Sequence, residues 1–446
     1  MKKPNVLFIP IDDLRPQLNC YGHDQMVSPH TDELAGEGVI FQNAYCQVPV
    51  CGATRASLLT GVRPNRDRFV TYDVWVDKDL PEALTLPEHF RKHEYTTISN
   101  GKVFHHRPDT ADRSWSAAPW YPETGGNWRN YLLPENQAVA VENNGRGPAF
   151  ECSDVPDNAY IDGQIADHTI EDLHRLKDTG EPFLLAAGFV KPHLPFNAPK
   201  RYWDLYKRAD ISLADNPFRP RGAPDAAIHN WGELRHYFKV PAKGPLPDEM
   251  ARTLIHGYYA ATSYTDAQVG RLLHELDRLE LRENTIIVLW GDHGWQLGEH
   301  GLWCKHCNFN TSLNAPLIVS APDIAGEKKS DALVEFADVY PTLCELAGIP
   351  LPDHLEGTSF APLLEHPNQQ WKKAAFSRYF AGDSIRTDRY LYTEWTSREG
   401  DLTARMLYDH ENDPKENENI SENPENRGLL TQLSKMLRDG WQAERI

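Results

Sequence analysis

Three acidic residues and a histidine lie directly after two apolar segments of the chain, and these residue types can bind a metal ion. Asp12 and Asp13 follow the first segment, and Asp292 and His293 follow a much later one. Taken singly, an acid after a strand is more often a turn former or a helix cap. Three carboxylates at one sheet edge repel one another unless a cation neutralises them, so together they predict a metal site. Their oxygen atoms favour calcium or magnesium over zinc.

Cys51 is the candidate nucleophile. It lies in VPVCGATRASLLTG, where the small residues after the cysteine favour a tight turn into a helix that begins near Thr54. An isolated cysteine is usually a buried structural residue. The chain has seven cysteines at irregular spacing, which do not form a disulfide framework. Cys304 and Cys307 form a CxxC pair, but one pair without partners is a weak indication of redox or zinc chemistry, and we interpret both as structural.

The elements that must position these residues are the strands of a parallel sheet. Residues 5–11, 182–190 and 284–292 are apolar on both faces, as expected for strands covered by helices. Long segments with apolar residues three and four apart, such as 251–279, predict the covering helices. The chain is therefore predicted to be an α/β protein with a large, mostly parallel central sheet. Ligands bind beyond the carboxyl ends of such strands, where the acids lie.

A domain boundary is predicted near residue 370. Residues 1–370 form the α/β domain, and residues 371–446 form a smaller α+β subdomain, whose alternating apolar and polar residues predict an antiparallel sheet before a final helix. Residues 106–160 and 207–247 lack periodicity and are predicted to be long surface loops. Loops of that length in a compact enzyme usually shape a binding site.

Composition and charge exclude some functions and compartments. The chain has 46 basic and 64 acidic residues, a formal charge of −18, which argues against a nucleic-acid partner. No segment approaches the roughly 20 apolar residues needed to span a bilayer, so no membrane association is expected. The apolar run after MKK is too short for a signal peptide. We expect a cytoplasmic protein as the chain stands, or a periplasmic or secreted one if a leader was removed.

The segment around Cys51 resembles the signature of the formylglycine-dependent (type I) sulfatases of the alkaline phosphatase superfamily. In that signature a Cys, any residue, Pro or Ala, any residue and Arg precede Thr-Gly, and the matching residues are Cys51, Ala53, Arg55, Thr60 and Gly61. The segments that contain Asp12 and Asp292 resemble the metal-binding segments of this family. GKVFH (101–105), FVKPHLPF (189–196) and GEHGLWCK (298–305) resemble the active-site segments of the iduronate-2-sulfatase-like group.

The resemblance implies a role for each matching residue. Cys51 would be oxidised to formylglycine (3-oxoalanine) by a formylglycine-generating or anaerobic sulfatase-maturating enzyme. Calcium, or alternatively magnesium, would be bound by Asp12, Asp13, residue 51, Asp292 and His293. The hydrated aldehyde would attack sulfur. Arg55 and Lys102 would hold the hydrated aldehyde, and Lys305 and His193 would contact the sulfate. His193 would also protonate the departing sugar oxygen. His105 would remove the proton whose loss re-forms the aldehyde.

The expected function is therefore that of a sulfuric ester hydrolase acting on a sulfated mono- or oligosaccharide, for example one with a 2-O-sulfated uronic acid. The acidic net charge suits a short saccharide better than a long polyanion. One alternative is a phosphomonoester or phosphonate hydrolase of the same superfamily, although a doubly charged phosphate generally recruits a second metal or a Thr or Ser nucleophile. The other alternative is a non-catalytic glycan-binding relative in which Cys51 is unmodified.

Overall fold

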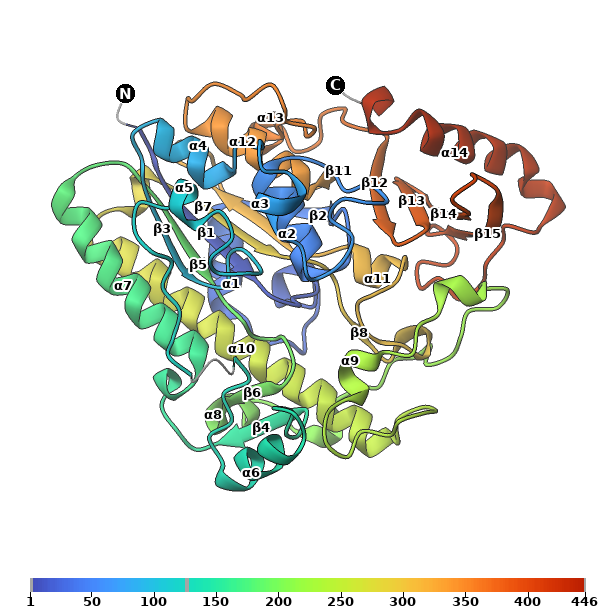
Figure 1. Ribbon diagram of the computed structural model, residues 1–446, viewed down its shortest axis with the longest axis horizontal. Helices are drawn as coiled ribbons and strands as arrows, with labels where there is room; N and C mark the ends of the chain where they lie inside the picture. Colours follow the sequence, from blue (N-terminus) through green and yellow to red (C-terminus); the bar gives the residue numbers. More distant parts are fainter. Residues whose placement is uncertain (1–2, 125–127, 445–446) are drawn as a thin grey trace.

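The centre of the computed structural model, which describes residues 3–124 and 128–444, is a seven-stranded sheet (Figure 1). The strand order is β11-β2-β10-β7-β1-β5-β3, and within the described residues β10 is the one strand that runs antiparallel to its neighbours. The predicted mostly parallel sheet is thus confirmed. Its strands are β1 (Asn5–Ile11), β2 (Val39–Tyr45), β3 (Thr96–Gly101), β5 (Phe183–Gly188), β7 (Thr285–Gly291), β10 (Leu317–Ser320) and β11 (Lys328–Glu335).

Helices cover both faces of this sheet, because its inner strands are apolar on both sides. Leu7 and Ile9 of β1 join the core on one face, whereas Val6 and Phe8 join the core on the other. Each such side chain contributes roughly 1.5–3 kcal/mol through burial. The helices on the Leu7 face include α7 (Ile161–Thr179) and α10 (Asp248–Arg278), which lie side by side in Figure 1; those on the Val6 face include α2 (Cys51–Thr60), α4 (Leu86–Lys92) and α12 (Val339–Leu346).

The two segments predicted as long loops differ from each other in the structure. Residues 207–247 are largely irregular and contain the short helix α9 (Gly232–Arg235). Residues 106–160, of which 125–127 lie outside the described residues, contain α5 (Ala111–Ser114), α6 (Pro134–Glu142) and β4 (Phe150–Ser153), so this loop prediction was wrong in part. The reason is that β4 pairs with β6 (Phe196–Pro199), a partner distant in sequence that local periodicity cannot reveal.

The remaining elements are short. They are α1 (Pro29–Glu37), α3 (Val76–Asp79), α8 (Lys200–Trp203), β8 (Gln296–Leu297), β9 (Trp303–Cys304), α11 (Asn310–Leu313) and α13 (Ala361–Glu365). No helix in the described part of the chain has both the length and the apolar character needed to cross a membrane.

The C-terminal part contains the predicted antiparallel sheet, which is confirmed. Its strands are joined in chain order, and the final helix packs on one face through Leu430 and Leu433. In Figure 1 this sheet and helix form the red part of the molecule, beside the central sheet. The elements are β12 (Ala374–Tyr379), β13 (Gly382–Thr387), β14 (Tyr390–Thr396), β15 (Leu402–Asp409) and α14 (Arg427–Asp439).

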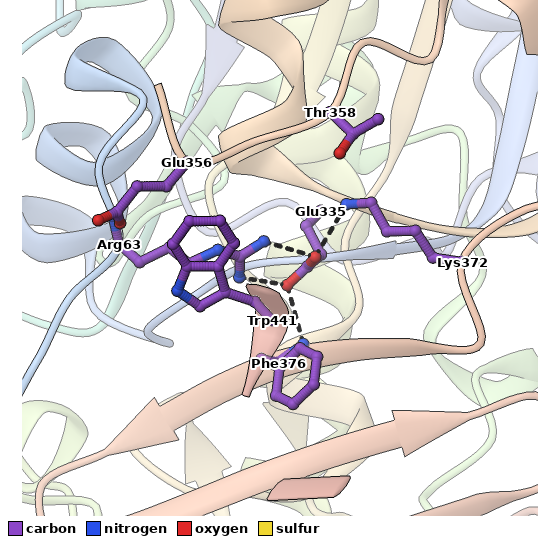
Figure 2. A pocket seen from close by; sticks show the side chains of 7 residues that line it. All are labelled: Arg63, Glu335, Glu356, Thr358, Lys372, Phe376 and Trp441. Carbon is purple, nitrogen blue, oxygen red and sulfur yellow. Dashed lines mark hydrogen bonds and ion pairs between the residues drawn. The ribbon is translucent and has the colours of Figure 1, made fainter. Parts of the chain in front are cut away.

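A buried group of charged residues joins this C-terminal sheet to the rest of the molecule (Figure 2). Glu335, the last residue of β11, accepts two hydrogen bonds from Arg63 at 2.5 and 2.7 Å and one from Lys372 at 3.0 Å. It also accepts the backbone N–H of Phe376 in β12 at 2.8 Å. The ring of Trp441 lies over the Arg63 guanidinium. Because these contacts cross residue 370, the proposed boundary stays a prediction.

Candidate active site and metal centre

The predicted metal ligands meet because β1 and β7 are neighbouring parallel strands. Ile11 is in register with Gly291, so the acids that follow each strand emerge together at the carboxyl edge of the sheet. The backbone N–H of Asp13 donates to Oδ1 of Asp292 at 3.0 Å. Asp12, Asp13, Asp292 and His293 are all fully buried. Four ionisable side chains in one buried cluster require compensating positive charge.

The donor atoms of this cluster fit a divalent cation. One oxygen, nitrogen or sulfur atom from each of Asp12, Cys51, Asp292 and His293 lies within 4.8 Å of the others. Nδ1 of His293 lies 2.9 Å from the carbonyl oxygen of Gly294, which can only accept, so Nδ1 carries the proton and the Nε2 lone pair is free to bind a metal. Oδ1 of Asp12 is buried and has no hydrogen-bond donor in the part of the chain that the structure describes. These observations match a coordination site for a hard cation.

Cys51 is the first residue of α2, so the predicted helix start near Thr54 was wrong. Val50 has an extended backbone, and its carbonyl oxygen accepts the N–H of Thr54 at 2.9 Å, which closes the first helical turn around the cysteine. The Cys51 Sγ atom lies 3.3 Å from Nε2 of His293. Gly52 is needed here because a Cβ at this position would lie 2.1 Å from the carbonyl oxygen of Tyr72.

The unmodified thiol of Cys51 is a poor nucleophile in this environment. Burial, and next the negative charge of Asp12, raise the pKa of the Cys51 thiol well above its usual value. The thiolate is the reactive form of cysteine, and here it is strongly disfavoured. The position suits a residue whose reactive group is an oxygen atom beside a cation more than it suits a free thiol.

Arg55 lies one turn after Cys51 on α2 and joins the helix to the metal cluster. Its fully buried guanidinium donates from Nε to Oδ2 of Asp292 at 3.0 Å, and its Nη2 lies 3.5 Å from Oδ1 of Asp12. Nη1 donates to the carbonyl oxygen of Val103 at 3.1 Å. The Arg55 charge thereby offsets part of the negative charge that the carboxylates bring.

Lys102, directly after β3, pairs with Asp12 through its ammonium group. Burial opposes ionisation of Asp12, but Lys102, His193 and Arg55 together hold the pKa of its carboxyl well below the usual range. The backbone of Lys102 comes close because Gly188 ends the neighbouring strand β5: a Cβ on Gly188 would lie 2.1 Å from the Lys102 carbonyl oxygen. The position of the Lys102 ammonium group therefore depends on the packing of two adjacent strand ends.

His193 and Lys305 approach the cluster from the loops after β5 and β9. Lys305 Nζ lies 3.0 Å from Oδ1 of Asp13, and His193 Nε2 lies 3.7 Å from Oδ2 of the same residue. Burial opposes the charge of Lys305, yet Asp13 is the main group that raises the pKa of the Lys305 ammonium well above its ordinary value. Lys305 thus carries a positive charge beside Cys51 at any physiological pH.

His105 lies at the edge of this group. Its Nδ1 is buried and has no hydrogen-bond partner among the described residues. Burial, followed by the positive charge of Lys102, lowers the pKa of His105 to about 2. The imidazole is therefore neutral at physiological pH. Within residues 3–124 and 128–444 no contact joins it to Cys51, and the charged side chains that act on it most are Lys102 and Asp12.

Glu233 belongs to the site and was missed by the sequence analysis. Its carboxylate lies 2.9 Å from Lys305 Nζ and 3.2 Å from His193 Nε2. Burial opposes its ionisation, but Lys305 and His193 hold the pKa of the Glu233 carboxyl well below its usual range. The residue is on α9, inside the segment 207–247 predicted to shape a binding site. The aperiodic sequence there has no signal that singles out one acid.

Comparison with known proteins shows which family the chain resembles. The family model described as Sulfatase matches residues 4–349, and the model described as N-sulphoglucosamine sulphohydrolase, C-terminal, matches residues 298–443. Human iduronate 2-sulfatase is 34% identical over 96% of this chain and 93% of its own length. Delta 4,5-hexuronate-2-O-sulfatase of Bacteroides thetaiotaomicron is 27% identical over 98% of this chain and 89% of its own length.

Solved structures show the same fold. The phosphonate monoester hydrolase of Agrobacterium radiobacter superposes with a TM-score of 0.81 over 99% of this chain and 96% of its own, at 22% sequence identity. A sequence identity of 22% establishes that the two proteins share a fold, but it does not establish that they catalyse the same reaction.

Proposed function

The chain belongs to the sulfatase family and is thus a sulfuric ester hydrolase, and from this premise we propose that it removes sulfate from a short sulfated saccharide through a formylglycine formed from Cys51. The observation that carries the proposal is the position of Cys51. It lies at the start of α2, 3.3 Å from His293 and next to Asp13, and Lys102 and Lys305 pair with the neighbouring Asp12 and Asp13. A buried, protonated thiol is neutral and gains no stabilisation from these charged neighbours. A hydrated aldehyde, in contrast, has hydroxyl groups that can ionise and be stabilised by positive charge.

The cation proposed for this site is calcium, with magnesium as the alternative, held by Asp12, Asp13, residue 51, Asp292 and His293. When bound, it supplies positive charge that stabilises an anionic oxygen nucleophile. The donor set supports this assignment because the carboxylates of Asp12 and Asp292 lie in one cluster with His293, whose Nε2 lone pair is available, and Oδ1 of Asp13 lies 3.4 Å from that Nε2. Oxygen ligands outnumber the softer nitrogen and sulfur donors, which favours a hard cation.

The first half of the proposed reaction transfers the sulfuryl group to residue 51. One hydroxyl of the hydrated aldehyde, ionised by loss of its proton to water, bonds to sulfur as the bond between sulfur and the sugar oxygen breaks, while Lys305 and His193 bind the sulfate oxygens. Nδ1 of His193 lies 2.7 Å from the carbonyl oxygen of Leu194, so Nδ1 carries a proton and Nε2 faces the cluster. A protonated His193 can then donate its Nε2 proton to the departing sugar oxygen, which leaves as an alcohol.

The second half releases sulfate. Residue 51 now carries one sulfate ester and one free hydroxyl on the same carbon. We assign removal of the hydroxyl proton to His105, whose buried Nδ1 atom has no hydrogen-bond partner among the described residues. The carbon–oxygen double bond re-forms as the bond between that carbon and the ester oxygen breaks, and sulfate departs. Arg55 and Lys102 hold residue 51 and its oxygen substituents in place during both halves.

A sulfated uronic acid is the proposed substrate. This rests on human iduronate 2-sulfatase and on the bacterial delta 4,5-hexuronate-2-O-sulfatase, whose names both specify a uronate and position 2. A partner enzyme that oxidises Cys51, either a formylglycine-generating enzyme or an anaerobic sulfatase-maturating enzyme, is part of the proposal.

Two measurements on the same purified protein test it. Mass spectrometry of the peptide that contains Cys51 should show conversion of the thiol to the aldehyde. A panel of defined disaccharides, each sulfated at one position, should then show release of sulfate from the 2-O-sulfated uronate, with aryl sulfate hydrolysed well above aryl phosphate. Converted protein that releases sulfate from no member of the panel would refute the substrate class. Faster hydrolysis of aryl phosphate would favour the phosphohydrolase alternative.

A further inference from the structure

Glu233 occupies a place that the proposed mechanism does not explain. Its Oε1 atom lies 3.1 Å from Lys305 Nζ and 3.2 Å from His193 Nε2. These are the two side chains proposed to bind the sulfate oxygens. One carboxylate oxygen thus lies between the two donors that a sulfate oxygen would need, which puts a fixed negative charge at the edge of an anion-binding site.

The carboxylate is held near this position by the fold. The next residue, Leu234, is buried in the core, so the helix α9 cannot swing away without exposing it. On the same helix, the Arg235 guanidinium stacks on the Trp231 ring at 3.2 Å and donates from Nε to the carbonyl oxygen of Asn230 at 2.8 Å. A rotation of the Glu233 side chain can make room for sulfate, but the negative charge remains within a few ångströms of it.

A fixed negative charge affects anions in proportion to their own charge. The electrostatic energy of a ligand is its charge multiplied by the local potential, so a unit charge nearby costs a dianion about twice what it costs a monoanion. Sulfate esters carry one negative charge, and phosphate monoesters carry two above their second ionisation. Lys305 and His193 without Glu233 would favour the more highly charged ester.

We infer that Glu233 determines the charge selectivity of the site, reducing its positive potential so that a singly charged sulfate ester is preferred over a doubly charged phosphate ester. The inference rests on the proposed function, since it takes Lys305 and His193 as the groups that bind the ester. It assigns Glu233 a role in choosing the substrate class rather than in the bond-breaking steps.

The test compares binding of two unreactive ligands that differ by one charge. Dissociation constants of benzenesulfonate, a monoanion, and of phenylphosphonate, at a pH where it is a dianion, are measured by calorimetry on the mature, metal-loaded enzyme and its Glu233→Gln variant. Removing the carboxylate charge should tighten binding of the sulfonate about tenfold and of the phosphonate about a hundredfold. The ratio of kcat/KM for aryl phosphate to that for aryl sulfate should rise by about the same tenfold.

Asp225→Asn is the matched control, because Asp225 is in the same loop segment and pairs with Arg219 on the surface. It removes the same net charge and should leave both dissociation constants unchanged. Equal changes for the two ligands in Glu233→Gln would overturn the inference, because a residue that only positions Lys305 and His193 affects both anions alike. Selectivity that shifts equally in Asp225→Asn would overturn it too.

Glu233→Asp provides a second test if the glutamine variant does not fold. It keeps the charge and shortens the side chain, so the preference for the monoanion should persist even if both affinities change; a switch of preference to the dianion would contradict the inference. The binding measurements require no turnover, so they decide the role of Glu233 separately. A failure of sulfated disaccharides to react would count against the proposed function instead.

Discussion

Nε of Arg55 donates a hydrogen bond to Oδ2 of Asp292 over 3.0 Å and thereby ties the helix that begins with Cys51 to the end of β7. Both side chains are fully buried. The contact explains how the proposed nucleophile on one element and the proposed metal ligands on two others keep a common geometry. It also links catalysis to stability, since the arginine that would hold the nucleophile is the counter-charge of a metal ligand.

Replacing Arg55 with methionine should destabilise the protein by about 3–5 kcal/mol, because it leaves the buried Asp292 without its guanidinium partner and removes one of the positive charges beside Asp12. Urea denaturation followed by circular dichroism measures this. Arg398→Met is the control: Arg398 is 86% exposed and lies 3.8 Å from Asp67, so its loss should cost under about 1 kcal/mol. Equal stabilities for the two variants would contradict the assigned role of Arg55.

Replacing Cys51 with serine should leave the fold intact and remove nearly all turnover. Serine fills almost the same space but offers one hydroxyl, so a sulfate ester formed on it has no second hydroxyl through which to eliminate. The measurement is steady-state release of sulfate, with thermal unfolding as the check on folding. Cys152→Ser, at an exposed cysteine, should retain full activity. Undiminished turnover in Cys51→Ser would contradict the formylglycine mechanism.

Removing the metal should abolish activity and lower the thermal unfolding temperature. The second effect follows because Asp12, Asp13 and Asp292 are buried together and would lose the charge that neutralises their repulsion. Activity and unfolding are measured after treatment with a chelator, and again after adding calcium or magnesium, with metal content determined by mass spectrometry. Full activity in protein shown to be free of metal would refute the assignment.

Replacing His193 with alanine should slow the reaction of sugar sulfates far more than that of aryl sulfates. A sugar alkoxide leaves poorly unless it is protonated, whereas a phenolate with electron-withdrawing substituents leaves without help. The readout is the ratio of kcat/KM for the two substrates. His105→Ala, assigned to the later elimination step, should instead leave that ratio unchanged and produce a burst of phenol from the aryl sulfate. An unchanged ratio in His193→Ala would remove it as the general acid.

Replacing Glu335 with glutamine should destabilise the junction with the C-terminal sheet in a pH-dependent way. Burial opposes its charge, yet Arg63 and Lys372 lower the pKa of Glu335 to about 2, from 4.5 when free, which corresponds to about 3 kcal/mol. A folded-state pKa below the unfolded value means that this stabilisation is present above pH 4.5 and is lost as the pH falls towards 2.

Denaturation of wild type and of Glu335→Gln at neutral and at strongly acidic pH checks this. The two proteins should differ at neutral pH and converge in acid. Glu345→Gln, at an exposed glutamate, should match wild type at both. A difference between wild type and Glu335→Gln that stays constant across the pH range would show that the charge of Glu335 is not what stabilises the junction.

The sequence by itself determined the features that depend on short-range patterns. Residues 5–11 and 284–292 are apolar on both faces, which predicted two strands of a covered parallel sheet and placed Asp12, Asp13, Asp292 and His293 at their ends. The small residues after Cys51 predicted the turn into a helix, although the exact first residue depended on how the Val50 carbonyl closes the turn. Such features can be predicted from the sequence because backbone geometry repeats every two residues in strands and every three to four residues in helices.

The tertiary structure alone decided which distant residues meet. β1 lies beside β7, and Arg55 reaches Asp292, through contacts between segments more than 230 residues apart, which no local period encodes. Glu233 lies in an aperiodic segment whose path is set by the burial of Leu234 and by its contacts with Lys305 and His193. Long-range packing fixes such segments, so the residue that we infer to select the substrate was visible only once the chain was folded.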